Sequence, residues 1–298
     1  MQSTGTVFPA QVRKNRLVRM TKKALCLTGF HTVMVILSLV FMFPFLYMFF
    51  MSMMTNAQSV GNPEVIFFPT EWRFENYAAV FDESFVRYFF NTFLIIACNL
   101  IFVPLACSFV AFGFSRCRLA GKEALFAVVL ATLMLPAAVT QIPLYVIFVD
   151  IGWINTPLPF IIPALLGGGS MNIFLVRQFM RGIPASLDEA ATIDGASKFR
   201  VFFSIYFPLC KPILIFTMIG VFNGTWNDFM GPLMYLRKPD SYTLALGVYY
   251  KFAGRLTEEN FPNIQMATGV IMVIPSAVVF FIFQKQLIEG VSVGAVKG

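Results

Sequence analysis

The sequence predicts an all-α polytopic membrane protein with six transmembrane helices and a water-exposed helical hairpin between the fourth and the fifth. The chain of 298 residues is 58% hydrophobic and only 12% charged, and it contains 36 phenylalanines. A soluble domain carries about 25% charged residues. Several apolar segments reach the length of about 20 residues that a membrane-spanning helix needs. The polar stretch 189–212 interrupts this pattern and is therefore expected in water.

Taken in order, the chain divides into an N-terminal tail (1–26), one membrane domain (27–285) and a C-terminal tail (286–298). The first apolar segment is too long for a signal peptide and lacks a small-residue cleavage site, so it should remain as an anchor. Pro136 and Pro143 fall inside the third segment, where neighbouring helices can satisfy the backbone groups that proline leaves free. The six spans are expected at 27–52, 88–113, 124–148, 160–179, 212–236 and 265–284.

The distribution of positive charge predicts the topology. Most of the 22 Lys and Arg residues lie in the N-terminal tail, the 115–123 turn, the polar hairpin with its flanks and the C-terminal tail. Cytoplasmic segments of membrane proteins carry an excess of Lys and Arg. Both termini and the hairpin are therefore expected in the cytoplasm. Membrane topology also accounts for the net charge of +7, so no nucleic-acid partner is expected.

Catalytic and metal-binding chemistry finds little support in the sequence. All five cysteines fall in spans or on the expected cytoplasmic side, so neither disulfides nor a clustered metal site is predicted. His31 lies near the inner end of the first span, where a packed residue is the usual outcome. The chain has no phosphate-binding loop of the GxxxxGK[ST] kind. We expect no catalytic residues and no enzyme activity in this chain.

The polar hairpin has the local chemistry of helix, turn and helix. Ser186 and Glu189 have the spacing of a capping box, and Asp188 adds a second carboxylate in the first turn, where the helix dipole favours negative charge. Gly195 should end this helix, since glycine enters the left-handed region without steric cost. Ser197 can begin a second helix. Its apolar residues are Phe199, Phe202, Phe203 and Tyr206, and it should close at Pro208 and Pro212.

The same stretch resembles the EAA loop of ABC importer permeases. The motif is Glu189-Ala190-Ala191, then Gly195, then Ile205-Tyr206-Phe207-Pro208, with Phe207 where that family usually has leucine. The surrounding segments are similar to those of carbohydrate permeases of the maltose type, in particular the second membrane subunit, which has the type I importer fold. These segments are NIFLVRQF (172–179), WNDFMGPL (226–233) and GAVKG (294–298).

The resemblance implies a function and a set of partners. Such proteins import a di- or oligosaccharide by alternating access, driven by ATP hydrolysis in partner subunits. Those partners are a homologous second permease, two ATP-binding cassette ATPases that bind ATP and Mg, and an extracytoplasmic solute-binding protein. The chain itself is expected to bind no cofactor and to lie in a bacterial or archaeal cytoplasmic membrane. Acidic oligosaccharides or sugar phosphate esters, and a scaffold role beside a substrate-holding partner permease, stay open, whereas secondary transport would require more acids within the spans.

The resemblance also assigns roles to individual residues. In the coupling-helix loop (186–212), Glu189 corresponds to the charged anchor at the ATPase surface, and Ala190 and Ala191 allow close approach. Gly195 makes the turn, and Ser186 and Asp194 complete this ATPase-coupling set. Val296 and Lys297 belong to the tail that reaches between the two ATPases in some members of the family.

Polar residues inside the spans are candidates for the substrate path, because they are costly in lipid and must face a cavity or a partner. Asn223, Trp226 and Asn227 fall on one helical face, which Met230 and Met234 extend. Asp228 lies to one side, and Asn99, Gln141 and Asn172 are weaker candidates for the same cavity. The alternative is that the 226–228 stretch only holds the fifth helix to its neighbours. Close helix packing is expected at Gly167–Gly169 and at the pair Gly220 and Gly224.

The outer segments, 53–86 and 237–263, should face whatever delivers the substrate. Tyr249, Tyr250, Lys251 and Arg255 could contact a binding protein or an acidic ligand there, or could belong to an ordinary solvated loop.

Overall fold

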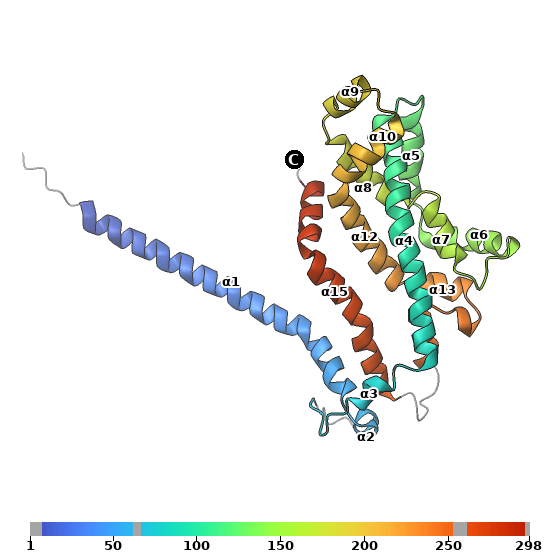
Figure 1. Ribbon diagram of the computed structural model, residues 1–298. Coiled ribbons are helices and arrows are strands. Elements are labelled where there is room, and N and C mark those ends of the chain that lie inside the picture. Colours follow the sequence, from blue (N-terminus) through green and yellow to red (C-terminus); the bar gives the residue numbers. More distant parts are fainter. Residues whose placement is uncertain (1–7, 62–66, 253–260, 296–298) are drawn as a thin grey trace, which may run out of the picture. The chain divides into compact units, whose positions relative to one another are not determined.

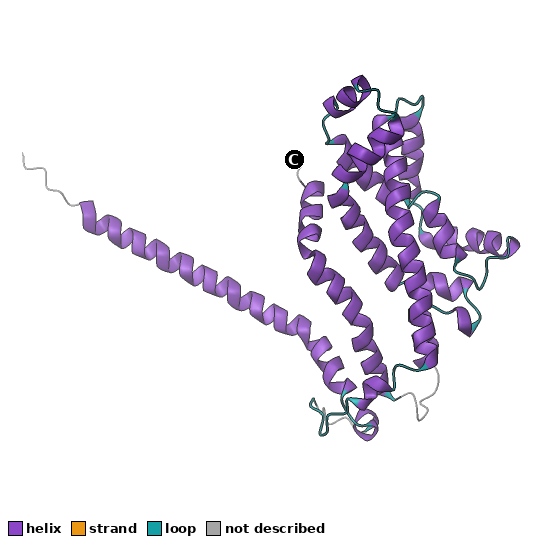
Figure 2. Cartoon of the chain, viewed as in Figure 1, coloured by secondary structure: helices purple, strands orange, loops and turns teal. Residues whose placement is uncertain are grey.

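The computed structural model describes the backbone of residues 8–61, 67–252 and 261–295, and every regular element in these ranges is a helix (Figures 1 and 2). The chain divides into two compact units. The first comprises residues 1–76 and 261–270, and the second comprises residues 77–260 and 271–298.

The first unit is built on α1 (Phe8–Ser52) and the short helix α2 (Asn56–Val60). The Thr55 hydroxyl accepts a hydrogen bond from the Gln58 N–H and so caps α2. The side chain of Asn76, in α3 (Glu75–Ala78), donates to the carbonyls of Ser52 and Met54 at 2.8 and 2.9 Å. The predicted N-terminal tail is helical from Phe8 onward, so α1 is longer than the span expected within it.

The second unit is organised around α4 (Glu83–Arg116), against which α7, α8, α12 and α14 pack. These helices span Leu158–Leu165, Ser170–Arg181, Lys211–Trp226 and Leu244–Phe252. Asp82 begins α4 by accepting a hydrogen bond from the Phe85 N–H at 2.7 Å. The core of this unit is apolar and lies toward the Arg116 end of α4. Its fully buried members include Cys107, Ala111, Val176, Met180, Phe202 and Tyr206.

Four helices are long and apolar enough to cross a membrane, and a bent pair forms a fifth candidate in the described part of the chain. They are Cys26–Ser52, Glu83–Arg116, Leu158–Arg181 and Pro262–Leu287, with Lys198–Leu209 and Lys211–Trp226 as the bent pair. The last of the four lies in α15 (Pro262–Ala295). The prediction of a multi-pass helical membrane protein is confirmed.

The third predicted span, 124–148, is not one helix. It is divided into α5 (Lys122–Thr132) and α6 (Ala137–Asp150). Pro136 lies at the break with ψ 135°, outside the helical region. Proline has no N–H to continue the ladder and disfavours helical backbone in the residue before it. Pro143 lies inside α6 and is tolerated there, as expected.

The fourth and fifth spans are also interrupted. The fourth remains one candidate span, Leu158–Arg181, but has an irregular turn between α7 and α8, where Gly168 and Gly169 have φ of 71° and 88°. A Cβ on Gly168 would lie 2.7 Å from the Val103 carbonyl oxygen, which confirms the expected close approach. The predicted span 212–236 is wrong as a single helix, because α12 ends at Trp226 and α13 (Met230–Tyr235) follows a break.

The expected close packing at the fifth-span glycines is not found within the described part of this chain. A Cβ on Gly220 or Gly224 would have no described atom within 4 Å.

Candidate functional site

The polar hairpin folds as helix, turn and helix, as predicted. It comprises α9 (Ser186–Ile193), α10 (Lys198–Val201), the π-helix η1 (Phe202–Tyr206) and α11 (Phe207–Leu209). Gly195 makes the turn with φ of 71°, in the left-handed region that glycine enters at no steric cost. The Ser197 hydroxyl caps α10 by accepting a hydrogen bond from the Arg200 N–H. The chain then bends by 74° into α12.

The predicted capping box at the start of α9 is wrong. Ala185 occupies the N-cap position with a helical backbone, and its carbonyl accepts from the N–H groups of Asp188 and Glu189. Ser186 is therefore already inside the helix and makes no capping hydrogen bond. The preceding Pro184 has a fixed φ, and the chain begins its turn at this point, one residue earlier than the serine pattern suggests.

One face of α9 is presented to solvent. Ser186, Glu189, Ala190 and Ile193 are all exposed, and their spacing places them on a single helical stripe. Ile193 has 86% of its surface exposed, although it is a large apolar residue. Glu189 forms no ion pair with any residue that the structure describes. We call these four residues the docking stripe.

The opposite face of α9 is attached to the rest of the second unit. Ala191 is only 7% exposed and packs in the apolar core, so it is not available to a partner as the resemblance implied. Of the two alanines in the motif, only Ala190 is exposed and can allow a partner to approach closely. Asp194 is exposed at the C-terminal end of α9, beside Gly195.

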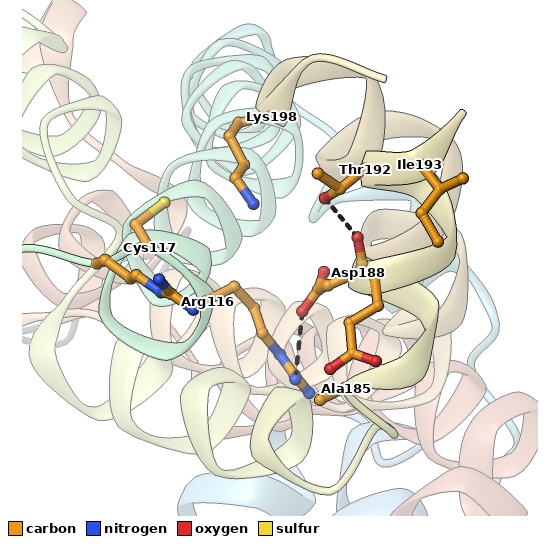
Figure 3. Close-up of a pocket in the computed structure, with 9 residues that line it drawn as sticks. Arg116, Cys117, Ala185, Asp188, Thr192, Ile193 and Lys198 are labelled. Atoms are coloured by element: carbon orange, nitrogen blue, oxygen red, sulfur yellow. Dashed lines mark hydrogen bonds and ion pairs between the residues drawn. The ribbon is translucent and has the colours of Figure 1, made fainter. Parts of the chain in front are cut away.

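The Asp188 side chain points toward Arg116, the last residue of α4 (Figure 3). Its Oδ2 accepts a hydrogen bond from the Tyr206 hydroxyl at 2.9 Å and lies 3.5 Å from a guanidinium nitrogen of Arg116. The Arg116 guanidinium also donates to the carbonyls of Met180 and Ile183 and lies 4.9 Å from the centre of the Tyr206 ring. Two adjacent carboxylates therefore have different surroundings, since Asp188 is paired inside the protein and Glu189 faces outward.

A pocket of about 850 Å³ lies beside α9 (Figure 3). Asp188 and Glu189 line it from α9, and Arg118 and Lys198 line it from the two adjoining segments. Neither of these cations forms an ion pair with a described residue. The pocket and the docking stripe together form a mixed polar and apolar surface suited to contact with a protein.

A second buried arginine ties α8 to α5. The Arg177 guanidinium bonds both oxygens of the Glu123 carboxylate at 2.8 and 2.9 Å and lies 3.8 Å from the centre of the Phe126 ring. In the described structure this pair has no hydrogen bond or ion pair with α9.

The predicted substrate residues of α12 are largely engaged within the chain. Asn223 and Asn227 donate their amide hydrogens to backbone carbonyls one turn earlier, at 3.1 and 2.9 Å. Trp226 is buried and donates to the Met272 carbonyl at 3.0 Å. Met230 and Met234 do not extend the stripe, because α12 has already ended. These contacts favour a packing role for Trp226.

The remaining candidates lie on different elements of the second unit. Asp228 accepts a hydrogen bond at 3.1 Å from the Gly231 N–H in the first turn of α13. The Asn172 side chain donates to the Gly168 carbonyl. Gln141 is half-buried on α6. Asn99 is buried, its Nδ2 lies 3.5 Å from the Thr225 hydroxyl, and its Oδ1 has no partner in the described structure.

The outer segment contains a defined ion pair. Lys251 bonds the Asp82 carboxylate at 2.7 Å, whereas Tyr249 and Tyr250 are exposed. Burial raises the pKa of Asp82, but the hydrogen bonds from Lys251 and the Phe85 N–H outweigh it, so the pKa lies below its ordinary value. Arg255, Val296 and Lys297 lie outside the described residues, as does any test of the contacts expected for them.

Sequence reasoning missed three features of the site. Ile193 was not singled out, although its spacing from Glu189 and Ala190 signals the same helical face. Arg116 was counted only as a topological charge, and Asp188 only as a first-turn carboxylate. Their partnership joins residues 72 positions apart and leaves no local signal. Among the described residues, no group of three or more His, Cys, Asp or Glu could hold a metal ion.

Residues 108–293 match the family described as binding-protein-dependent transport system inner membrane component. This match covers more than half of the chain, and the chain belongs to that family. It is a membrane translocation subunit of the ABC importer class and not an enzyme.

Individual relatives agree. A putative ABC transporter permease of Caldicellulosiruptor is 34% identical over 86% of this chain and 91% of its own length. An arabinooligosaccharide transport permease of Halalkalibacterium halodurans is 30% identical over 86% of this chain and 91% of its own length. A chain of a bacterial ABC transporter for the acidic polysaccharide alginate has the same fold, with a TM-score of 0.75 at 22% identity over 94% of this chain and 99% of that chain. The resemblance to carbohydrate ABC importer permeases is confirmed.

Proposed function

We propose that this chain is one of two permease subunits in an importer that moves a di- or oligosaccharide across the cytoplasmic membrane. In this proposal, the second permease is homologous, and two ATPase subunits bind ATP and Mg beneath the pair. A solute-binding protein delivers the sugar from outside, and this chain binds no cofactor. Both termini and α9 lie in the cytoplasm, which the concentration of Lys and Arg in those segments supports.

The observation that carries the proposal is the docking stripe of α9. An amphipathic helix binds a groove through residues at i, i+3, i+4 and i+7, the spacing of Ser186, Glu189, Ala190 and Ile193. The stripe combines a small residue for close approach, an unpaired carboxylate and an 86% exposed isoleucine. Glu189 and Ala190 are the first two residues of the EAA motif. The stripe therefore supports α9 as the coupling helix that docks on an ATPase.

The sugar assignment rests on the relatives and on the polar groups of α12. The relative in Halalkalibacterium halodurans is named for arabinooligosaccharides, and the structural neighbour imports an acidic polysaccharide. Asn227 is the exposed amide on this helix, and amides exchange hydrogen bonds with sugar hydroxyls. The internal bonds of Asn223 and Trp226 favour a second possibility, in which the partner permease holds most of the sugar.

Co-purification and uptake test the proposal together. The chain is co-expressed with the permease, ATPase and binding-protein genes from its own source and reconstituted in proteoliposomes. A panel of arabinooligosaccharide, lactose and alginate oligosaccharide separates neutral from acidic substrates. Crosslinking of a photoreactive form of the accepted sugar shows which permease holds it.

A charge reversal tests the docking stripe directly. Glu189→Lys should abolish co-purification of the ATPase while the chain still inserts into the membrane. Glu83→Lys is the matched control. Glu83 is also an exposed carboxylate, but it lies at the first residue of α4, whereas α9 contacts the last residue of that helix, Arg116. Normal ATPase binding and uptake by Glu189→Lys would refute the proposed docking.

A further inference from the structure

Arg116, the last residue of α4, joins several elements through one guanidinium group. It donates to the carbonyl of Met180 in the last turn of α8 and to the carbonyl of Ile183 just beyond that helix. It pairs with Asp188 of α9 and lies over the ring of Tyr206 in η1. Its side chain is only 10% exposed. Four segments of the second unit therefore meet at a single, largely buried charge.

The helix α9 depends on this meeting point for its position. It has eight residues, and isolated helices shorter than about 12–15 residues are marginal in water. Within α9, only Ala191 is buried in the apolar core. The specific polar contacts on its inner face run through Asp188 to Tyr206 and Arg116, as Figure 3 shows for the arginine. Apolar packing alone gives α9 little to fix its orientation.

The chemistry of the cluster suits the transmission of force. Hydrogen bonds to charged groups are directional and roughly twice as strong as those between neutral groups. Tyr206 is fully buried in the core shared by α4 and α8, so a pull on Asp188 acts directly on packed side chains. The Glu123–Arg177 pair has similar chemistry but lies on α5 and α8, and in the described structure it forms no hydrogen bond or ion pair with α9.

We propose that Arg116, Asp188 and Tyr206 form the clamp through which movement of α9 is passed to α4 and to η1. Arg116 and Tyr206 are positioning residues, and neither needs to touch the ATPase or the sugar. This inference rests on the proposed function, because α9 moves only if a partner acts on it. In this inference, Asp188 bonds α9 to the rest of the permease, and Glu189, the next residue, contacts the ATPase.

The test uses the assembled complex in proteoliposomes. Asp188→Asn keeps the size of the side chain and removes its charge, and Tyr206→Phe removes only the hydroxyl that bonds Oδ2. The matched control is Glu123→Gln, which discharges the other arginine partner. Three quantities are measured: ATPase co-purification, amide hydrogen exchange across residues 186–193, and sugar transported per ATP hydrolysed, using the panel sugar with the fastest uptake.

The clamp predicts that both variants keep the ATPase bound but lose coupling. Exchange at 186–193 should rise roughly tenfold in Asp188→Asn, because local opening of α9 becomes easier. Transport per ATP should fall by about tenfold, within the range of coupling between sites, and by a smaller factor in Tyr206→Phe. Glu123→Gln should change neither. A purely structural role would lower transport and ATPase activity together and leave their ratio constant.

An unchanged ratio in Tyr206→Phe and Asp188→Asn would overturn the clamp, as would an equal fall in Glu123→Gln. If Asp188→Asn does not assemble, Tyr206→Phe decides, because its ring still fills the core. Failure of the proposed function looks different: the ATPase would not co-purify with the unmodified chain, or Glu189→Lys would have no effect. Either result would refute both proposals. An unchanged ratio of transport to ATP hydrolysis in Asp188→Asn and Tyr206→Phe would refute the clamp alone and leave the proposed docking intact.

Discussion

Truncation of Ile193 should weaken ATPase binding without weakening the fold of the permease. The side chain is 86% exposed in the free chain, so Ile193→Ala removes almost no internal contact. If the ATPase groove buries it, the lost transfer free energy is about 2 kcal/mol. A difference of about 1.4 kcal/mol corresponds to tenfold in affinity, so the dissociation constant should rise roughly 30-fold.

The assay is a titration of purified ATPase against the detergent-solubilised permease pair, together with thermal unfolding of the pair. Phe74→Ala is the control, because Phe74 is also a large apolar residue that is mostly exposed, but it lies on the expected outer segment. The control should bind ATPase normally. Binding by Ile193→Ala within twofold of the unmodified chain would show that this residue lies outside the interface, and a large fall in thermal stability would show that its exposure has been misread.

Three further predictions concern stability and pH. Gly168 and Gly121 both have positive φ, but only Gly168 has backbone atoms within 3 Å of an added Cβ. Gly121→Ala should therefore lower the free energy of unfolding by only about 1 kcal/mol. Gly168→Ala should destabilise the fold more and lower the unfolding temperature by several degrees. The depressed pKa of Asp82 means that its pair with Lys251 contributes stability above the ordinary carboxyl pKa, lost as pH falls through the lower folded value. The protection factors of amides near 251, which correct for the pH dependence of intrinsic exchange, should therefore fall at acidic pH. Asp82→Asn should abolish that dependence, and a persistent dependence would implicate another group. Trp226→Phe should lower thermal stability by about 1 kcal/mol through loss of the bond to the Met272 carbonyl, with an unchanged preference among sugars. An altered preference would place Trp226 in the sugar path.

Features governed by neighbouring residues could be predicted from the sequence. The long apolar segments around α1, α4 and α15 exceed membrane length, so their helical state follows from composition. Gly195 and Ser197 were placed correctly, because a left-handed turn and an N-cap are properties of one or two residues. The EAA spacing then predicted the family to which the hairpin that contains these two residues belongs.

Two kinds of feature could not be predicted from the sequence: those in which local signals compete, and those that depend on contacts between distant residues. At Pro136 the apolar pattern predicts a continuing helix, and the missing N–H ends it. After Trp226 the helix ends, and α13 begins at Met230, although the hydropathy of the sequence does not change there. Ser186 and Glu189 have the spacing of a capping box, but α9 begins one residue earlier, with Ala185 at the N-cap, and the Ala185 carbonyl accepts the first hydrogen bonds of the helix. The Arg116–Asp188 pair depends on a fold that brings the end of α4 to α9.

The helix α4 connects the two ends of its unit as a single rod. It runs without a break for 34 residues, through Pro104, and at 1.5 Å per residue its length is about 50 Å. Arg116 lies at one end, and at the other Arg87 and Asn91 hold residues 240–242 by side-chain bonds. A tilt imposed at the first end must displace the second in the opposite direction about any fulcrum between them. One rigid axis can therefore pass a movement at the Arg116 end of α4 to residues 240–242 at its other end.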